Sequence, residues 1–205
     1  MKTQILKHNA EKAAEILLAG GLVAVPTETV YGLAASGLNP DAVAEIYEVK
    51  GRPAQKPISL LVSGMEDAEK FCVEIPEKAY ILAKKFWPGP LTMILKKSDA
   101  VPSIVTAGGD TVGVRCPDHP DTLEIIRKAG IPLAAPSANF SGEPSPKDAA
   151  AVLRYFDGKI ECVVDGGPCS VGIESTIVDM TVWPPKILRQ GGLPAEEIFR
   201  ALELV

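Results

Sequence analysis

The chain has 205 residues, enough for one globular domain with a buried core, and 46% of them are hydrophobic against 23% charged. This composition excludes a disordered chain, and no apolar run approaches the roughly 20 residues that a membrane-spanning helix needs. The formal net charge of −5 argues against a protein whose whole surface binds nucleic acid, although a local basic patch is compatible with it.

Cysteine and histidine usage argues against a secreted protein with disulfides and against a zinc protein. The four cysteines form no C-x-x-C pair, and the N-terminal segment lacks the apolar core of a signal peptide. We therefore expect reduced thiols and a cytoplasmic location. The two histidines, His8 and His119, have no metal-ligand spacing, which disfavours a zinc site.

Hydrophobic periodicity and capping residues predict helices and strands that intermix along the chain. Asn9 and Asn39 are typical helix N-caps, and glycines at 20 and 51 end the apolar faces that follow. The predicted elements are, in chain order, a helix over 9–20, a strand over 22–25, a helix over 39–51, a strand over 58–62, a helix over 76–86, strands over 91–96 and 111–117, a helix over 120–129, a strand within 131–139, a helix over 148–156, strands over 161–165, 175–179 and 186–192, and a helix over 194–202.

The fold class that this order predicts is α/β, because strands and helices alternate without a linker, a repeat or a low-complexity segment. We expect a single domain over residues 1–205, built on a twisted mixed β-sheet flanked by helices. Polar loops at 98–110 and 137–147 are long for a compact domain and are candidates for function.

Five polar clusters lie at the ends of predicted strands or helices, where ligand sites of open α/β sheets are usually found, and two of them lie within residues 26–57. The stretch "PTETVYG" (26–32) offers the hydroxyls of Thr27 and Thr29, which bind a small polar ligand or satisfy backbone groups in a turn. The stretch "KGRPAQKP" (50–57) places Lys50, Arg52 and Lys56 on a loop that its glycine and prolines keep from being helical. These cations hold a phosphate group or mark a solvated basic loop.

The third cluster centres on Arg115, which ends the predicted strand "TVGVRCP" (111–117) that Thr111 begins. Burying a guanidinium without a partner is costly, so an arginine emerging from an apolar run needs a carboxylate. That carboxylate belongs either to an internal Asp or Glu or to a substrate bound through two parallel hydrogen bonds.

The remaining clusters lie in the C-terminal half. The loop "PSANFSGEPSP" (136–146) carries Ser137, Asn139 and Ser145 and has donors and backbone freedom to wrap a nucleotide, unless it is a plain surface loop. "GIESTIVD" (172–179) and "KILRQGG" (186–192) place Ser175 and Arg189 at strand ends. The P-loop, Rossmann and α/β-hydrolase signatures are all missing, and two histidines offer little for a Ser-His-Asp triad.

Taken together and in this order, "PTETVYGL", "KGRPAQKP", "VGVRCP", "PSANFSG", "GIESTIVD" and "ILRQGG" resemble the YrdC-like family, the threonylcarbamoyl-adenylate synthases. The resemblance runs from about residue 10 to residue 192 and matches the short, single-domain form. It implies a twisted sheet around a large, positively charged concave cavity, like those that bind double-stranded RNA. It also implies the condensation of L-threonine, bicarbonate and ATP, with Mg²⁺, to threonylcarbamoyl-AMP and pyrophosphate, for the threonylcarbamoyl modification of tRNA.

The resemblance also implies roles for individual residues. Lys50 and Arg52 would be catalytic. The threonine site would consist of Thr27, Thr29, Arg115 and Ser175, and the ATP site of Lys50, Arg52, Lys56, Thr111, Ser137, Asn139, Ser145 and Arg189. The expected partners are ATP, L-threonine, bicarbonate, a downstream tRNA-modifying threonylcarbamoyl transferase, and tRNA as a further candidate.

Two positions depart from the family pattern. Leu61 stands where many relatives carry a histidine, and Lys147 replaces the threonine of a Ser-Pro-Thr sequence. The departure at Leu61 keeps open a paralogue that acts on another carbamoyl or nucleotide substrate. A separate alternative is an RNA-binding module without catalysis. Threonine-dependent turnover of ATP distinguishes the synthase from an RNA-binding module, whose RNA affinity would fall with salt.

Overall fold

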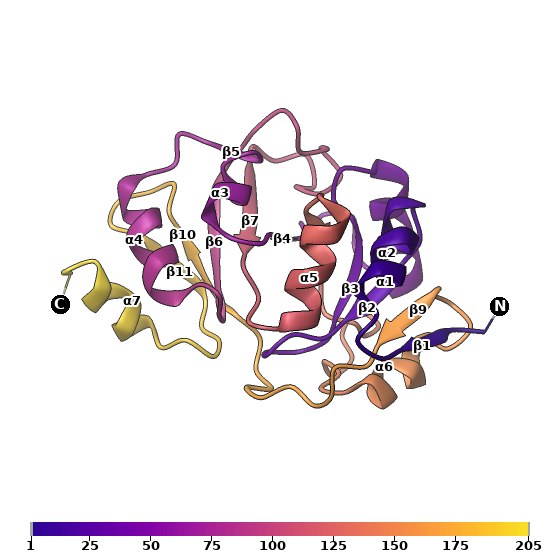
Figure 1. Cartoon of the computed structure of the whole chain (residues 1–205). Coiled ribbons are helices and arrows are strands. Elements are labelled where there is room, and N and C mark those ends of the chain that lie inside the picture. Colours follow the sequence, from indigo (N-terminus) through magenta and orange to yellow (C-terminus); the bar gives the residue numbers. More distant parts are fainter. Residues whose placement is uncertain (1, 205) are drawn as a thin grey trace.

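An 11-stranded mixed β-sheet runs through the molecule, in the strand order β1-β9-β2-β3-β8-β4-β7-β6-β10-β11, with β5 paired to β6 outside this path (Figure 1). The computed structural model describes residues 2–204. The strands are β1 (Gln4–Leu6), β2 (Val23–Val25), β3 (Gly32–Ser36), β4 (Leu60–Leu61), β5 (Cys72–Val73), β6 (Leu91–Lys97), β7 (Thr111–Arg115), β8 (Leu133–Ala134), β9 (Cys162–Val164), β10 (Thr176–Asp179) and β11 (Lys186–Arg189).

Two helices begin at the capping asparagines that the sequence predicts. The side chain of Asn9 accepts a hydrogen bond from the backbone of Lys12, and that of Asn39 accepts from the backbone of Asp41 and Ala42. Gly51 ends its helix in the left-handed conformation, at φ 59°, which glycine adopts without steric cost. The helices are α1 (Ala10–Leu18), α2 (Pro40–Lys50), α3 (Met65–Ala68), α4 (Glu77–Phe86), α5 (Pro120–Ala129), α6 (Ala149–Phe156) and α7 (Ala195–Ala201).

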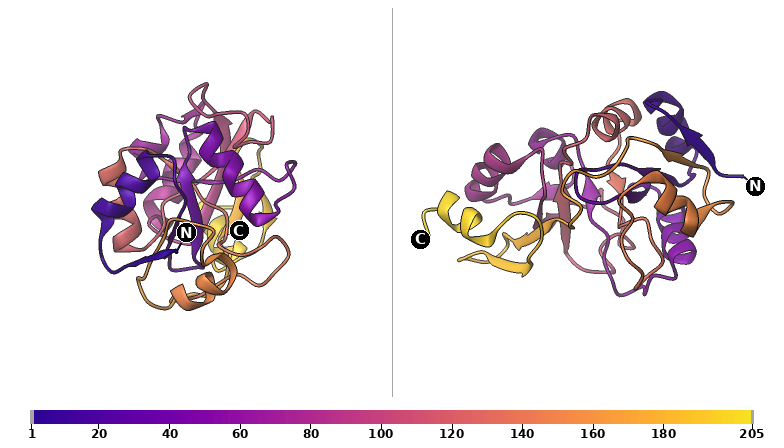
Figure 2. Two further views of the ribbon diagram at one scale, coloured as in Figure 1. Left: turned by 90° about the vertical axis from the view of Figure 1, so that its right-hand side faces the viewer. Right: turned by 90° about the horizontal axis from the view of Figure 1, so that it is seen from below.

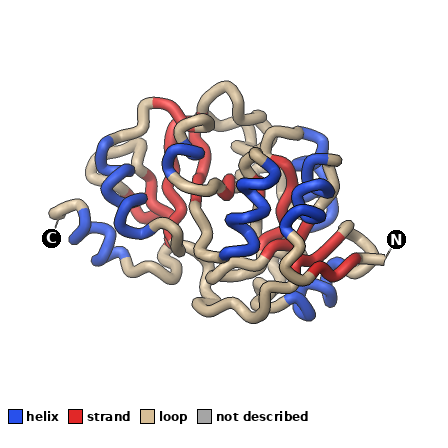
Figure 3. The backbone as a smooth tube through the Cα atoms, viewed as in Figure 1, coloured by secondary structure: helices blue, strands red, loops and turns tan. Residues whose placement is uncertain are grey.

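The predicted fold class is confirmed, and the differences concern short elements. β1, β3, α3 and β5 were not expected, and the predicted strand over 58–62 contracts to the two residues of β4. The sequence of β3, "GLAAS", lacks the β-branched and aromatic residues typical of strands, so its pairing with β2 and β8 decides its conformation. Much of the chain between the strands is loop (Figure 3).

Helices cover both faces of the sheet. α1 and α5 pack side by side on one face, and α2 and α6 lie on the other (Figure 2). One apolar cluster, which includes Leu17 and Ile126, lies under α1 and α5, and a larger one includes Ile46 and Phe156 on the opposite side. Among residues 2–204, no helix has the length and apolar character needed to cross a membrane.

The register of the central strands brings chemically important side chains to one face. Leu61 of β4 is the direct partner of Arg115 of β7. Farther along the sheet, Thr92 of β6 is the partner of Ile177 of β10, which is in turn the partner of Arg189 of β11. Because paired residues project to the same side, these residues form a continuous floor on the sheet.

Candidate functional site

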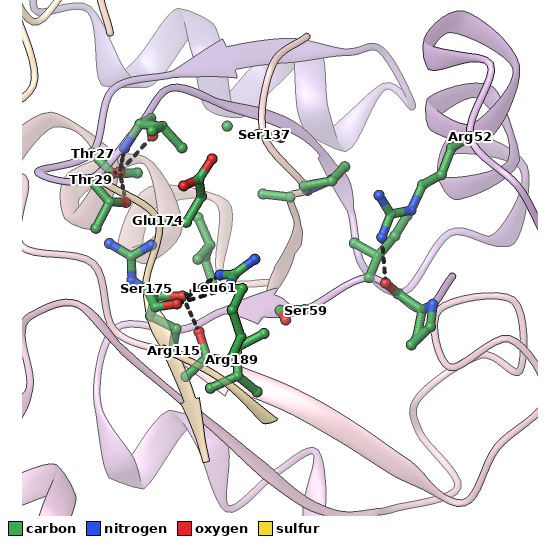
Figure 4. A pocket seen from close by; sticks show the side chains of 18 residues that line it. Thr27, Thr29, Arg52, Ser59, Leu61, Arg115, Ser137, Glu174, Ser175 and Arg189 are labelled. Carbon is green, nitrogen blue, oxygen red and sulfur yellow. Dashed lines mark hydrogen bonds between the residues drawn. The ribbon is translucent and has the colours of Figure 1, made fainter. Parts of the chain in front are cut away.

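A cavity of about 180 Å³ lies against this floor. Its walls come from the loop after β2, the basic loop after α2, the segment after β8 and the segment before β10 (Figure 4). The predicted site residues that line it are Thr27, Thr29, Arg52, Arg115, Ser137, Ser175 and Arg189. The fold thus brings together residues that are up to 162 positions apart in sequence, from Thr27 to Arg189.

Thr27 and Thr29 are linked to each other on one wall of the cavity. The Thr27 hydroxyl donates to the Val30 carbonyl (2.7 Å) and lies 2.9 Å from the Thr29 hydroxyl. Because its one proton is used on Val30, Thr27 accepts from Thr29 in the second contact. Thr27 also accepts from the backbone N–H groups of Thr29 and Val30. Of the two roles considered for it, Thr27 therefore has the one of satisfying backbone groups in a turn. The oxygen of Thr29 keeps acceptor capacity for a ligand.

Arg115 has an internal carboxylate partner. Its Nη2 donates to Oε1 of Glu28 at 2.7 Å, and its Nε donates to the Gly89 carbonyl at 3.2 Å. The second Glu28 oxygen accepts from the backbone N–H of Asp118 at 3.0 Å. Within residues 2–204, no hydrogen bond engages Nη1 of Arg115, which lines the cavity. The internal-partner alternative is therefore correct for one edge of the guanidinium, and the other edge can receive an anion.

Arg189, Ser175 and Thr92 form a second polar group on the floor. Nε and Nη2 of Arg189 donate to the Ser175 carbonyl at 3.1 and 2.8 Å, and Nη2 also donates to the Ser175 hydroxyl at 3.2 Å. The Ser175 hydroxyl lies 2.8 Å from that of Thr92. Arg189 thus fixes the backbone that carries Ser175.

Arg52 lies across the cavity from Arg115 in the view of Figure 4. Its Nε donates to the Lys56 carbonyl (3.1 Å) and its Nη2 to the Pro57 carbonyl (2.7 Å), so the basic loop folds back onto its own arginine. Tyr47 donates to the same Lys56 carbonyl at 2.9 Å. The Lys56 side chain is exposed and lies outside the cavity lining.

Lys50 is buried behind the cavity wall. Its ammonium group donates to the carbonyls of Ser137 and Asn139, and the residue is 2% exposed. Burial, and secondly the charge of Arg52, lower the pKa of Lys50 to about 7. Lys50 therefore joins the end of α2 to the 137–139 segment, and direct contact with a phosphate would require it to leave these carbonyls.

Three other predicted residues lie outside the lining. Thr111 begins β7, at the far end of that strand from Arg115. Asn139 donates to the carbonyls of Phe140 and Glu143 at 2.9 and 2.7 Å, and its buried Oδ1 has no partner within residues 2–204. Ser145 donates to Oε1 of Glu174 at 2.6 Å, and Glu174 does line the cavity.

Several residues that line the cavity or support its lining had no site role predicted from the sequence: Glu28, Ser59, Thr92 and Glu174. Glu28 lies inside "PTETVYG" and Glu174 inside "GIESTIVD", so both motifs were singled out but neither carboxylate was given a role. A signal was available for Glu28, since Arg115 was expected to need a carboxylate. Ser59 and Thr92 lie within strand-like segments and had no such signal.

Comparisons with known proteins support one family. The family model "Sua5_yciO_yrdC: Telomere recombination" matches residues 15–191. The threonylcarbamoyl-AMP synthase of Pyrococcus abyssi is 53% identical over 190 residues, and that of Bacillus subtilis is 49% identical over 188 residues. These alignments cover 93% and 91% of this chain. A crystal structure of Pyrococcus abyssi Sua5 complexed with L-threonine superposes with a TM-score of 0.97 at 48% identity, over 99% of this chain and 62% of that one.

The chain spans about half the length of these two relatives. The alignments cover 56% of the Pyrococcus abyssi enzyme and 54% of the Bacillus subtilis enzyme. The family match begins before Thr27 and ends after Arg189, so it contains every predicted site residue.

Proposed function

The chain belongs to the Sua5/YciO/YrdC family, and from this premise we propose that it is a threonylcarbamoyl-AMP synthase. The proposed reaction converts L-threonine, bicarbonate and ATP to threonylcarbamoyl-AMP, pyrophosphate and water. The observation that carries the proposal is that Arg115 and Arg52 line a single cavity from different sides. One substrate has a carboxylate and the other a triphosphate, and both need cations.

The amino acid is proposed to bind at the end of the cavity where Arg115 and Ser175 lie. The unengaged edge of Arg115 is suited to the threonine carboxylate, because guanidinium groups bind carboxylates through charge-assisted hydrogen bonds. Thr29 offers a hydroxyl oxygen on the adjoining wall. A relative of this chain has been crystallised with L-threonine, which supports the choice of amino acid.

The nucleotide is proposed to extend from Arg52 along Ser137 and past the cavity mouth. The cavity, at about 180 Å³, is smaller than the roughly 300–1,000 Å³ of pockets that enclose drug-sized ligands, so only part of ATP would lie inside. Arg52 and Arg189 are the cations available to the phosphates within the lining. Lys50, Lys56, Thr111, Asn139 and Ser145 lie outside the cavity lining, so their proposed ATP roles require contact with the part of the nucleotide outside the cavity or a movement of their side chains.

Magnesium is proposed to arrive with the triphosphate. Within residues 2–204, no group of three or more His, Cys, Asp or Glu side chains is arranged to hold a metal ion. The cavity lining, in which Glu174 is the one carboxylate among the described residues, fits an ion that keeps phosphate oxygens and water as its main ligands, as Mg²⁺ commonly does. When bound, Mg²⁺ would neutralise charge on the phosphates.

The chemistry requires positioning and charge neutralisation more than a strong acid or base. The threonine amine and bicarbonate form a carbamate with loss of water, and a carbamate oxygen attacks the α-phosphorus as the bond to pyrophosphate breaks. Negative charge builds up on the phosphoryl oxygens and the leaving group, where Arg52 and Arg189 can stabilise it. Holding both reactants in one cavity supplies the proximity that the attack needs.

In the cell, we propose that the product passes to a tRNA-modifying threonylcarbamoyl transferase in the cytoplasm. The test of the proposed reaction is pyrophosphate release from ATP, Mg²⁺ and bicarbonate, with and without L-threonine. We expect release that depends on threonine. Release that is equal without threonine would reject the synthase and favour a paralogue, and RNA binding without any release would favour a binding module.

A further inference from the structure

Glu174 is the one acidic side chain among the described residues that line the cavity, alongside Arg52, Arg115 and Arg189. Glu28, the other carboxylate nearby, is fully engaged by Arg115 and by the backbone of Asp118. In Figure 4, the Glu174 side chain points into the cavity between the two threonines and Ser175, and Arg52 lies on the far side. A carboxylate in a cavity rich in arginine is unexpected if every ligand group is an anion.

The contacts of Glu174 hold its carboxylate ionised and leave one oxygen free. Oε1 accepts from the Ser145 hydroxyl at 2.6 Å, and within residues 2–204 no side-chain hydrogen bond engages Oε2. The bond from Ser145 lowers the pKa of Glu174, and the charges of Arg189 and Lys147 act in the same direction against the effect of burial. The free oxygen therefore presents a negative charge to the cavity.

An amino acid at neutral pH has a cationic group that the arginines cannot bind. Its carboxylate needs a cation, and its α-ammonium group needs an anion or hydrogen-bond acceptors at a short distance from that cation. Glu174 is adjacent in sequence to Ser175, at the end of the cavity that contains Arg115. The pair of Arg115 and Glu174 therefore matches the two charges of a zwitterion.

We propose that the Glu174 carboxylate binds the α-ammonium group of the amino acid, so that the cavity accepts free α-amino acids and rejects acids that lack this group. The proposal rests on the proposed function, because it assumes an amino-acid substrate. Glu174 is a binding residue here: a carboxylate with a lowered pKa holds an ammonium ion well and is a weak base toward it. Ser145 positions Glu174.

The test is calorimetric binding of L-threonine and of 2,3-dihydroxybutyrate, in which a hydroxyl replaces the ammonium group. For Glu174→Gln, we expect threonine binding to weaken about 10- to 100-fold, the usual effect of losing a charged hydrogen-bond partner. Binding of the hydroxy acid should be weak and equal in the two proteins. Glu174→Asp, which keeps the charge, should recover part of the threonine affinity, and Glu196→Gln on exposed α7 is the matched control.

Steady-state kinetics provide a second readout. Loss of an interaction that holds the ground-state ammonium should raise the KM for threonine without lowering kcat, and the KM for ATP should change little. Circular dichroism and thermal melting check that each variant is folded.

Each outcome decides the proposal. Unchanged threonine affinity in a folded Glu174→Gln variant overturns it and leaves the proposed synthase intact. A raised Mg²⁺ requirement with unchanged threonine affinity also overturns it and assigns the carboxylate to the metal. If the unmodified protein binds no threonine, both the inference and the proposed function fail.

Discussion

Glu28 and Arg115 form an ion pair in which Oε1 and Nη2 are 2.7 Å apart and the two side chains are 6% and 8% exposed. Glu28 comes from the loop after β2 and Arg115 from the end of β7, so the pair joins two distant parts of the sheet. Since one guanidinium edge is fixed, the other faces the cavity in a defined orientation. The pair thus links the stability of the fold to the geometry of the proposed threonine site.

Glu28→Gln should destabilise the protein, because it leaves the buried Arg115 charge without its counter-ion. Breaking a buried pair typically costs about 3–5 kcal/mol, and the amide that remains can keep one hydrogen bond, so we expect the lower end of this range. Urea denaturation measures the change in unfolding free energy. The double variant Glu28→Gln/Arg115→Met should recover part of the lost stability, since the unpaired charge is gone, while threonine binding should not return. Equal instability in the single and double variants would contradict this account.

Gly191 approaches the backbone that carries Glu174 and Ser175. A Cβ atom at position 191 would lie 2.2 Å from the Glu174 carbonyl oxygen and 2.4 Å from the Ser175 carbonyl carbon, which are backbone atoms and cannot turn aside. Gly191→Ala should therefore displace this segment, lower the unfolding free energy by about 1–3 kcal/mol or more, and weaken threonine binding.

The matched control for Gly191 is Gly64→Ala, where an added Cβ meets nothing within 4 Å. It should leave threonine binding unchanged. Calorimetry on the two variants is the measurement, and equal threonine affinities would show that the position of the 174–175 backbone does not matter for the ligand.

Lys50 should make stability depend on pH. Its pKa is about 7 in the folded protein against an ordinary 10.5, so between these values the unfolded chain binds more protons than the folded one. The unfolding free energy should therefore rise with pH across this window, by roughly 2 kcal/mol between pH 7 and 9 from this group alone. Below pH 7 both states are protonated and the contribution is flat.

Lys50→Met isolates this contribution, because it keeps an unbranched side chain without the titrating group. Urea denaturation of both proteins at pH 7 and 9 gives the comparison. The difference in slope between them is the predicted quantity, and identical pH dependence would mean that burial does not lower the Lys50 pKa.

Leu61 forms an apolar part of the cavity floor beside Arg115 and is 4% exposed. We expect it to contact the methyl group that distinguishes threonine from serine. One methyl group in an apolar contact contributes about 1 kcal/mol, so Leu61→Ala should lower the threonine-to-serine ratio of kcat/KM several-fold. Leu18→Ala, at an exposed position on α1, is the control. An unchanged ratio would place the methyl group elsewhere.

Much of the fold followed from local sequence. Asn9, Asn39 and Gly51 mark helix ends through side-chain caps and a left-handed turn, which depend on neighbouring residues alone. β3 did not follow, because its small residues have little strand preference and become a strand only between two partners. Short elements of this kind depend on tertiary pairing that a local pattern does not contain.

Site residues could be predicted where a motif lies at the end of a predicted strand. They were harder to predict where their contacts join residues far apart in sequence. Arg115 was expected to need a carboxylate, yet its partner Glu28 is 87 positions away, and spacing alone does not identify such a pair. Lys50 and Arg52 are two positions apart and were expected to act together. The end of α2 instead directs Lys50 toward the backbone carbonyls of Ser137 and Asn139, while Arg52 lines the cavity.

The most direct test of the central claim is a crystal structure of the protein with L-threonine and a non-hydrolysable ATP analogue. The account predicts that both ligands share the cavity, with the threonine carboxylate on Arg115 and its ammonium group on Glu174, and with phosphate oxygens on Arg52. Threonine bound with its carboxylate away from Arg115, or the nucleotide bound outside this cavity, would contradict it.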